Sequence, residues 1–102
     1  MPNLTCKKVT FYSEGDELSF FKWLDSINCI EKCEGTDDTM YLTVNTKKPS
    51  DECLRELLAL FHRYKVDMSQ LEIFLNEKNK EWFFDRKQAY WHKKVFKKIN
   101  KS

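Results

Sequence analysis

The sequence predicts an α+β protein with a ferredoxin-like, split βαβ fold, and three observations lead to this prediction. Strand-like alternation of apolar and polar residues occurs near both ends of residues 8–76 and in a hairpin between them. Segments 16–27 and 51–64 instead repeat apolar residues at helical spacing. The resulting order is β-α-β-β-α-β. Right-handed connections then place both helices on one face of a four-stranded antiparallel sheet, with the first and third strands central.

The first strand and the first helix are predicted from residues 8–27. KVTFYS, residues 8–13, alternates like a half-buried strand, with Val9 and Phe11 on one side. Ser13 or Asp16 can then accept backbone N–H groups and start a helix over residues 16–27. Its apolar face is formed by residues at i, i+3, i+4 and i+7, which are Phe20, Trp23, Leu24 and Ile27.

A hairpin is predicted over residues 29–46. CIEKCEG, residues 29–35, mixes charged residues with Cys and Ile, which suits a strand at the edge of a sheet. TMYLTVNT, residues 39–46, alternates cleanly, and GTDDT between them is rich in turn-forming residues.

The second helix and the fourth strand complete the predicted body. Ser50 can cap a helix over residues 51–64, whose apolar face is Leu54, Leu57, Leu58 and Phe61. LEIFLN, residues 71–76, alternates again and predicts a strand with Leu71, Ile73 and Leu75 opposite Glu72, Phe74 and Asn76.

The composition indicates a single domain, residues 1–102, with a body at 8–76 and a C-terminal extension at 77–102. Residues 82–102 contain six of the fifteen aromatic residues. They also contain seven of the eighteen basic residues against one acid, whereas residues 1–81 carry eleven basic and fifteen acidic residues. The extension and the body therefore have opposite net charge.

The predicted sheet would expose aromatic side chains on the face that the helices leave open. Tyr12, Tyr41 and Phe74 fall on that face, and a monomer seldom leaves a large apolar patch uncovered. In a helix, Phe83, Tyr90 and Trp91 would share one stripe, so we expect the extension to pack on or near this face.

Catalysis and metal binding have no support in the sequence. Neither His62 nor His92 is tied by spacing to a nucleophile or a carboxylate, and the chain has only two glycines, so it carries no glycine-rich phosphate loop. We therefore expect no enzyme activity and no cofactor. The four cysteines, Cys6, Cys29, Cys33 and Cys53, lack the spacing of a zinc site, and we expect ordinary thiols whose redox role stays open.

The hydropathy pattern argues against a membrane protein. Apolar runs are far shorter than the ~20 residues that a bilayer requires, and the first residues lack the apolar stretch of a signal peptide. We expect a cytoplasmic protein with a protein partner or a homo-oligomeric state.

Two binding alternatives follow from the extension. A single-stranded nucleic acid could stack on Tyr12, Tyr41 and Phe74, while its phosphates contact a basic patch of Arg86, Lys93, Lys94, Lys97 and Lys98. A small apolar ligand could instead bind between the extension and the sheet, against Trp82, Phe84, Tyr90 and Trp91.

The stretches FYSEGDELSFFKWLDSI, LRELLALFHRY and AYWHKKVF together resemble small uncharacterised single-domain bacterial proteins of mobile gene cassettes or toxin and immunity loci. The resemblance implies a noncovalent binding role, either as an immunity-type inhibitor or as a self-associating module. An inhibitor of a basic toxin needs an acidic surface, for which the candidate partner-binding residues are Glu31, Glu34, Asp37 and Asp38.

Overall fold

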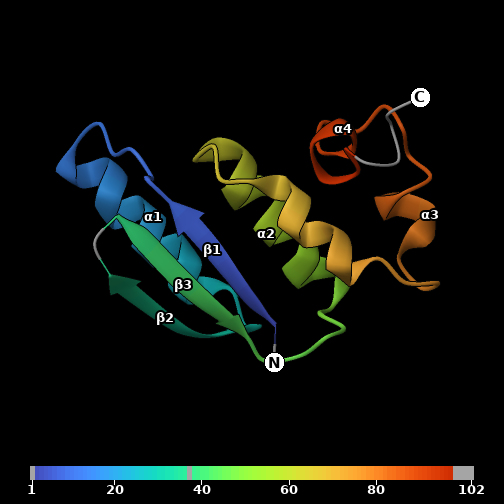
Figure 1. The fold of residues 1–102 in the computed structure, drawn as a ribbon, viewed down its shortest axis with the longest axis horizontal. Coiled ribbons are helices and arrows are strands. Elements are labelled where there is room, and N and C mark those ends of the chain that lie inside the picture. The colour runs from blue at the N-terminus through green and yellow to red at the C-terminus, as the bar shows by residue number, and fades with distance from the viewer. Residues whose placement is uncertain (1, 37, 98–102) are drawn as a thin grey trace.

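The computed structural model describes residues 2–36 and 38–97, which form a small α+β domain. Figure 1 shows the sheet on one side, the C-terminal helices on the other, and helix α2 between them. The elements in chain order are β1 (Asn3–Lys7), α1 (Glu14–Ser26), β2 (Ile30–Thr36), β3 (Thr39–Val44), α2 (Asp51–Arg63), the 3₁₀-helix η1 (Met68–Phe74), α3 (Lys80–Phe83) and α4 (His92–Val95).

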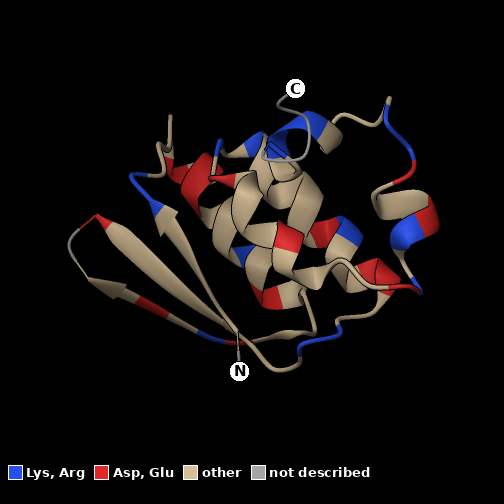
Figure 2. Cartoon of the chain, turned by 45° about the vertical axis from the view of Figure 1, so that its right-hand side comes forward, with Lys and Arg blue, Asp and Glu red and all other residues tan. Residues whose placement is uncertain are grey.

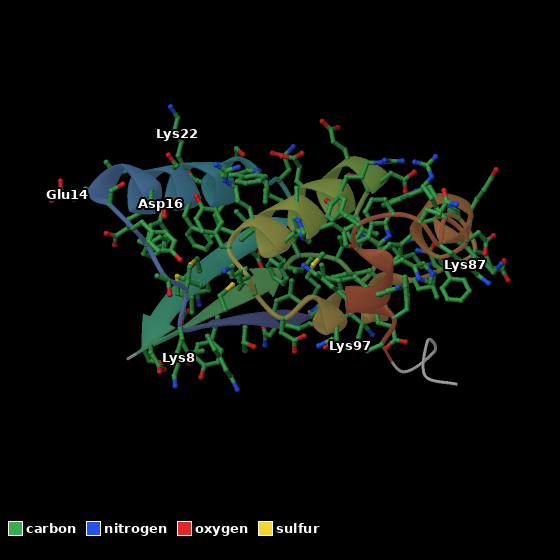
Figure 3. The ribbon with its side chains drawn as sticks, turned by 90° about the horizontal axis from the view of Figure 1, so that it is seen from above. Lys8, Glu14, Asp16, Lys22, Lys87 and Lys97 are labelled. Carbon is green, nitrogen blue, oxygen red and sulfur yellow. The ribbon has the colours of Figure 1, made fainter. Side chains whose placement is uncertain are left out.

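The sheet has three strands in the order β1-β3-β2, so the predicted four-stranded ferredoxin-like sheet is wrong. Both pairings are antiparallel, and β3 is the central strand. Leu4 and Cys6 of β1 lie opposite Leu42 and Met40 of β3 and face the helices. Figure 3 shows α1 and α2 on the same side of the sheet, as the sequence predicted for its two helices.

The first strand lies earlier than predicted, at Asn3–Lys7 instead of residues 8–13. Lys8 adopts the left-handed conformation, with φ of 51°, which ends the strand. Val9 and Phe11 do pack against the core, but from a loop. The alternation of Val9 and Phe11 therefore predicted their packing correctly but their secondary structure wrongly, because a loop can also direct alternate side chains to the core.

The predicted fourth strand is the 3₁₀-helix η1. Met68, Leu71 and Phe74 are its buried residues, and their spacing of three matches the three residues per turn of such a helix. Ile73, expected to face the core, is 61% exposed, whereas Phe74, expected on the open face, is 1% exposed. The side chain of Asp67 caps the helix by accepting the N–H of Ser69 at 3.0 Å.

A side chain of η1 occupies the place that a fourth strand would take beside β1. Oε1 of Gln70 accepts the N–H of Thr5 at 2.7 Å, and Nε2 of Gln70 donates to the carbonyl oxygen of Thr5 at 2.8 Å. The same Nε2 donates to the carbonyl oxygen of Asp67 at 2.8 Å. One amide thus satisfies both outward-facing backbone groups of Thr5, as a neighbouring strand would do.

The two long helices agree closely with the sequence prediction. Helix α1 begins after Ser13, whose Oγ accepts the N–H of Asp16 at 3.1 Å. Helix α2 begins after Ser50, which caps the N–H of Cys53 at 3.2 Å. Helix α2 buries five side chains, because α1 lies on one side of it and η1 with the C-terminal segment on the other: Leu54, Leu57, Leu58, Leu60 and Phe61.

The C-terminal segment packs on α2 and η1 and not on the open face of the sheet, which corrects the expected cover. The guanidinium of Arg55 in α2 lies 4.2 Å from the ring centroid of Trp82, and the ring of His62 contacts Tyr90. The indole N–H of Trp91 donates to the carbonyl oxygen of Phe83 at 2.9 Å, so the segment folds back on itself. It contains two four-residue helices instead of one long aromatic stripe.

Candidate functional site

Strand β2 presents an open edge, and this edge is the first candidate site. Backbone bonds from Lys8 to Asp38 and from Val44 to Pro2 fix which groups of β3 point toward β1. In the antiparallel register, residues 32, 34 and 36 of β2 therefore bond toward β3. The N–H and C=O groups of Cys33 and Gly35 point to the outer edge, where they can pair with another strand.

A β-bulge at Glu31 sets the faces of β2. Ile30 lies opposite Val44 and Lys32 opposite Thr43, so Glu31 is one residue more than the partner strand has. The bulge turns both Ile30 and Cys33 to the helix side of the sheet. Lys32 and Glu34 therefore face the open side, where Nζ of Lys32 lies 2.8 Å from Oε1 of Glu34. Figure 2 shows the resulting acidic, basic and acidic bands in succession along β2.

A groove of about 490 Å³ runs between α1 and β2 on the helix side. Its α1 wall includes Leu18 and Phe21, which are 71% and 39% exposed, and its β2 wall includes Ile30 and Cys33. Leu18 and Phe21 were not among the site residues predicted from the sequence. Their signal was an apolar stripe on α1 wider than the one face that packing on the sheet requires.

The predicted partner-binding acids lie along this hairpin but do not share one face. Glu31 lines the groove on the helix side, while Glu34 lies on the open side and pairs with Lys32. Asp38 is exposed at the turn and accepts the hydroxyl of Thr39 at 3.2 Å, and position 37 is outside the described residues. The acids therefore flank the edge of β2 instead of forming one acidic patch.

The predicted aromatic face does not form. Tyr12 is 83% exposed in the loop between β1 and α1, Tyr41 is half-exposed on the open face of β3, and Phe74 is buried in the core. The three side chains belong to different surfaces, because the segments expected to hold Tyr12 and Phe74 in the sheet are a loop and a 3₁₀-helix.

The predicted residues of the C-terminal segment mostly serve packing. Trp91 is buried, and Trp82 and Phe84 are half-buried; the rings of Trp82 and Trp91 meet edge to face at 5.8 Å. Tyr90 remains exposed beside His62. Because the segment lies beyond α2 from the sheet, these rings line no gap between the segment and the sheet.

The basic residues of the segment are exposed, and two of them extend a basic surface from the body. Arg86 and Lys93 are exposed elsewhere on the segment, and position 98 is outside the described residues. Lys94 and Lys97 instead line a hollow of about 300 Å³ together with Lys65 and Asp67.

Lys65 also lines a second hollow, of about 470 Å³, with Lys8, Arg63, Tyr12 and Asp16. Figure 1 shows the ends of β1 and α2 and helix α4 along one side of the molecule, and Figure 3 places Lys8 and Lys97 on the same side. Lys65 lines both hollows, and together they form the second candidate site, which we call the basic groove.

Five cations and two carboxylates line the basic groove, and both carboxylates also accept hydrogen bonds within the chain. Asp16 accepts the N–H of Tyr12 at 3.0 Å, and Asp67 accepts the hydroxyl of Ser69, which lowers the pKa of Asp67. In the part of the chain that the structure describes, ion pairs join Lys32 to Glu34 and Lys80 to Asp85, and none involves the five cations, which are Lys8, Arg63, Lys65, Lys94 and Lys97. Sequence spacing could not reveal this groove, since its residues come from three separate segments, 8–16, 61–68 and 94–97.

The cysteines are free thiols in the structure. Burial raises the pKa of Cys6 to about 12; burial, and then the neighbouring thiol of Cys53, raises the pKa of Cys29 to about 12. Cys33 is exposed on β2. Within residues 2–36 and 38–97, no three His, Cys, Asp or Glu side chains are grouped so that they could hold a metal ion. No helix in the same ranges is long and apolar enough to cross a membrane.

Comparisons with family models, with curated proteins and with solved structures gave no match to this chain. The candidate sites therefore rest on the geometry and chemistry of the residues alone.

Proposed function

We propose that the protein acts by noncovalent protein binding, without catalysis, and that an extended segment of its partner pairs with the open edge of β2. The observation that carries this proposal is the coincidence of two outward-facing backbone positions, Cys33 and Gly35, with the groove beside them, whose lining includes the exposed apolar side chains of Leu18 and Phe21. Strand addition of this kind obtains affinity from backbone hydrogen bonds and specificity from alternate side chains.

The groove supplies the specificity. A strand added to β2 directs every second side chain to the helix side, where Leu18 and Phe21 form an apolar wall. On the open side, Lys32 and Glu34 favour a partner that carries opposite charges at positions two residues apart. The acids on the hairpin, which the immunity-type interpretation emphasised, lie beside this contact.

A peptide selection tests the proposal. A phage library of random twelve-residue peptides is selected on the immobilised protein, and the enriched peptides are synthesised with a fluorophore for anisotropy titration. We expect peptides with apolar residues at alternate positions, which bind at least about tenfold more weakly to Leu18→Glu. Leu18 suits the test because its side chain is already largely in water, so folding tolerates the change.

Ile73→Glu is the matched control, because Ile73 is similarly exposed but lies on η1, which contributes no residue to the groove. Selected peptides should bind this variant like the unmodified protein. Peptides that bind both variants equally well, or a selection that enriches none, would contradict the proposal.

A second candidate function is binding of single-stranded nucleic acid, now supported by the basic groove instead of a sheet face. The five cations of the groove can follow phosphates, and the exposed rings of Tyr12 and Tyr90 stand near its two ends. We expect a labelled oligothymidine to bind at low salt, with an affinity that falls steeply as salt is added.

The double variant Arg63→Gln, Lys65→Gln should weaken this binding and reduce the salt slope by about 1.4. The control is Lys47→Gln, Lys48→Gln, which removes the same charge near the start of α2. No anisotropy change at low salt, or an equal loss in the control, would remove this candidate.

We further propose that the protein acts in the cytoplasm, where four free thiols would persist in their reduced form. Cell fractionation tests this proposal, and recovery of the protein in an exported or membrane fraction would contradict it.

A further inference from the structure

We propose that the partner strand is the β2 of a second copy, so that two chains form a two-fold symmetric dimer with one continuous six-stranded sheet. This inference rests on the proposed function and names the partner of the same edge. In a two-fold dimer the same strand meets itself antiparallel, so each residue of β2 has a defined counterpart.

The outward-facing backbone groups restrict the register. Cys33 and Gly35 bond outward, so they must pair with outward-facing positions of the other strand. Centring the pairing on Cys33 satisfies this, because Cys33 then exchanges both of its backbone bonds with Cys33 of the second copy. Lys32 then lies opposite Glu34 of that copy, and Glu34 lies opposite its Lys32.

The charges select this register over its neighbours. Lys32 and Glu34 occupy the non-hydrogen-bonded pairs, in which facing side chains approach most closely. Moving the centre by one residue places either Lys32 opposite Lys32 or Glu34 opposite Glu34. Of these three registers, only the one centred on Cys33 gives two attractive pairs, and these join the two Lys32–Glu34 ion pairs of the single chains into one alternating cluster of four charges.

The groove between α1 and β2 becomes covered in the same arrangement. The two-fold axis is perpendicular to the sheet, so both copies of α1 lie on the same face and meet across the junction of the two β2 strands. Leu18 and Phe21 of each copy, exposed in the single chain, then flank the junction from both sides. The dimer thus accounts for the open edge and for the apolar wall with one contact.

The experiment is sedimentation analysis of charge variants in reducing buffer, over a range of protein concentrations. Lys32→Glu and Glu34→Lys each replace both attractive pairs with repulsive ones, and each should weaken the dimer about tenfold or more. The combined swap Lys32→Glu, Glu34→Lys restores attraction and should recover the dimer. A mixture of the two single variants should also pair, since one strand is then wholly acidic and the other wholly basic at these positions.

Glu77→Lys and Lys78→Glu serve as controls, because they change the same charges on an exposed turn outside β2. They should leave the dimer unchanged. If the unmodified protein stays monomeric at every concentration while selected peptides still bind at the groove, the second copy is the wrong partner and protein binding by strand addition stands. If dimers form but neither the swap nor the mixture restores them, the register is wrong.

Cys33 supplies an independent readout of the register. Facing residues of a hydrogen-bonded antiparallel pair have Cα atoms about 5.5 Å apart, within the range that a disulfide spans. Diamide takes two protons and two electrons from the two Cys33 thiols, is itself reduced to the hydrazine, and leaves an S–S bond. Covalent dimers should form in the unmodified protein and in Cys53→Ser, and not in Cys33→Ser. Equal yields from Cys33→Ser would refute the proposed register.

Discussion

Replacement of Gln70 tests whether one amide closes the sheet at β1. Gln70→Ala removes hydrogen bonds to the N–H of Thr5, to its carbonyl oxygen and to the carbonyl oxygen of Asp67, with lengths of 2.7, 2.8 and 2.8 Å. At about 1 kcal/mol net for each bond, the free energy of unfolding should fall by ~2–3 kcal/mol. That is a large share of the ~5–15 kcal/mol expected of a domain this size.

Urea unfolding followed by circular dichroism measures the change, with Gln88→Ala as the matched control. Gln88 is exposed, so its loss should change the free energy of unfolding by less than ~0.5 kcal/mol. A Gln70→Ala variant as stable as the control would refute the reasoning, because the edge of β1 would then be stable without its amide partner.

Gln70→Glu sharpens the test through its pH dependence. The carboxylate can still accept the N–H of Thr5, but it also faces the carbonyl oxygens of Thr5 and Asp67, where the amide donated. The folded state therefore raises the pKa of the introduced carboxyl above its unfolded value. By linkage, this variant loses stability as pH rises from the unfolded pKa, about 4.3, through the folded one. A deficit relative to Gln70→Ala that does not shrink on acidification would contradict the geometry.

Three further outcomes follow from the fold. Phe74→Ala should lower the free energy of unfolding by ~3–5 kcal/mol and Ile73→Ala by less than ~0.5 kcal/mol in urea titrations, the reverse of what a strand would give. Lys65→Gly should raise the melting temperature, because Lys65 adopts φ of 57° after α2, a conformation that glycine adopts without strain. The free energy of unfolding should rise by ~0.5–1 kcal/mol in Lys65→Gly and should not rise in Lys65→Ala. In native protein, iodoacetamide should modify the partly exposed Cys53 well before Cys6, whose burial raises its pKa to about 12, as peptide mass spectrometry can show.

The outcomes that would contradict them are equally specific. If Ile73→Ala and Phe74→Ala lowered the free energy of unfolding equally, residues 68–74 would not form the 3₁₀-helix described for η1. A stabilised Lys65→Ala would show that the side chain, and not the left-handed backbone, is responsible. Rapid modification of Cys6 would mean that the strand β1 opens readily.

The helices could be predicted from the sequence because local signals define them. Ser13 and Ser50 cap them, and their apolar residues recur at helical spacing, so no information from distant residues was needed. The hairpin was predicted for the same reason, since the alternation in Met40, Leu42 and Val44 and the turn before it are local.

The predictions for the first strand and for residues 71–76 were wrong because the secondary structure of these segments depends on contacts with distant residues. Leu4 and Cys6 alternate as Val9 and Phe11 do, and only pairing with β3 makes one segment a strand and the other a loop. Similarly, LEIFLN has the alternation of a strand in its sequence. A 3₁₀-helix is favoured instead, because it buries Leu71 and Phe74 against α2 and places the amide of Gln70 beside Thr5.

Part of the candidate site could be predicted from the sequence. The charged composition of β2 indicated an edge strand, and the hairpin acids lie on that edge. Its bulge, its outward-facing backbone groups and the groove beside α1 depend on register and on packing between distant elements, which no local pattern encodes.

The unequal treatment of the two sheet edges sets a limit on how far assembly can proceed. The side of β1 is terminated by Gln70 and η1, so an incoming strand finds no free N–H or C=O at Thr5. A strand added beside β1 would have to displace Gln70 at Thr5, whereas the edge of β2 is open at Cys33 and Gly35; in the proposed dimer, each copy uses this open edge. A dimer formed in this way would keep Gln70 beside both outer β1 strands, which would disfavour the addition of further strands and the growth of fibres.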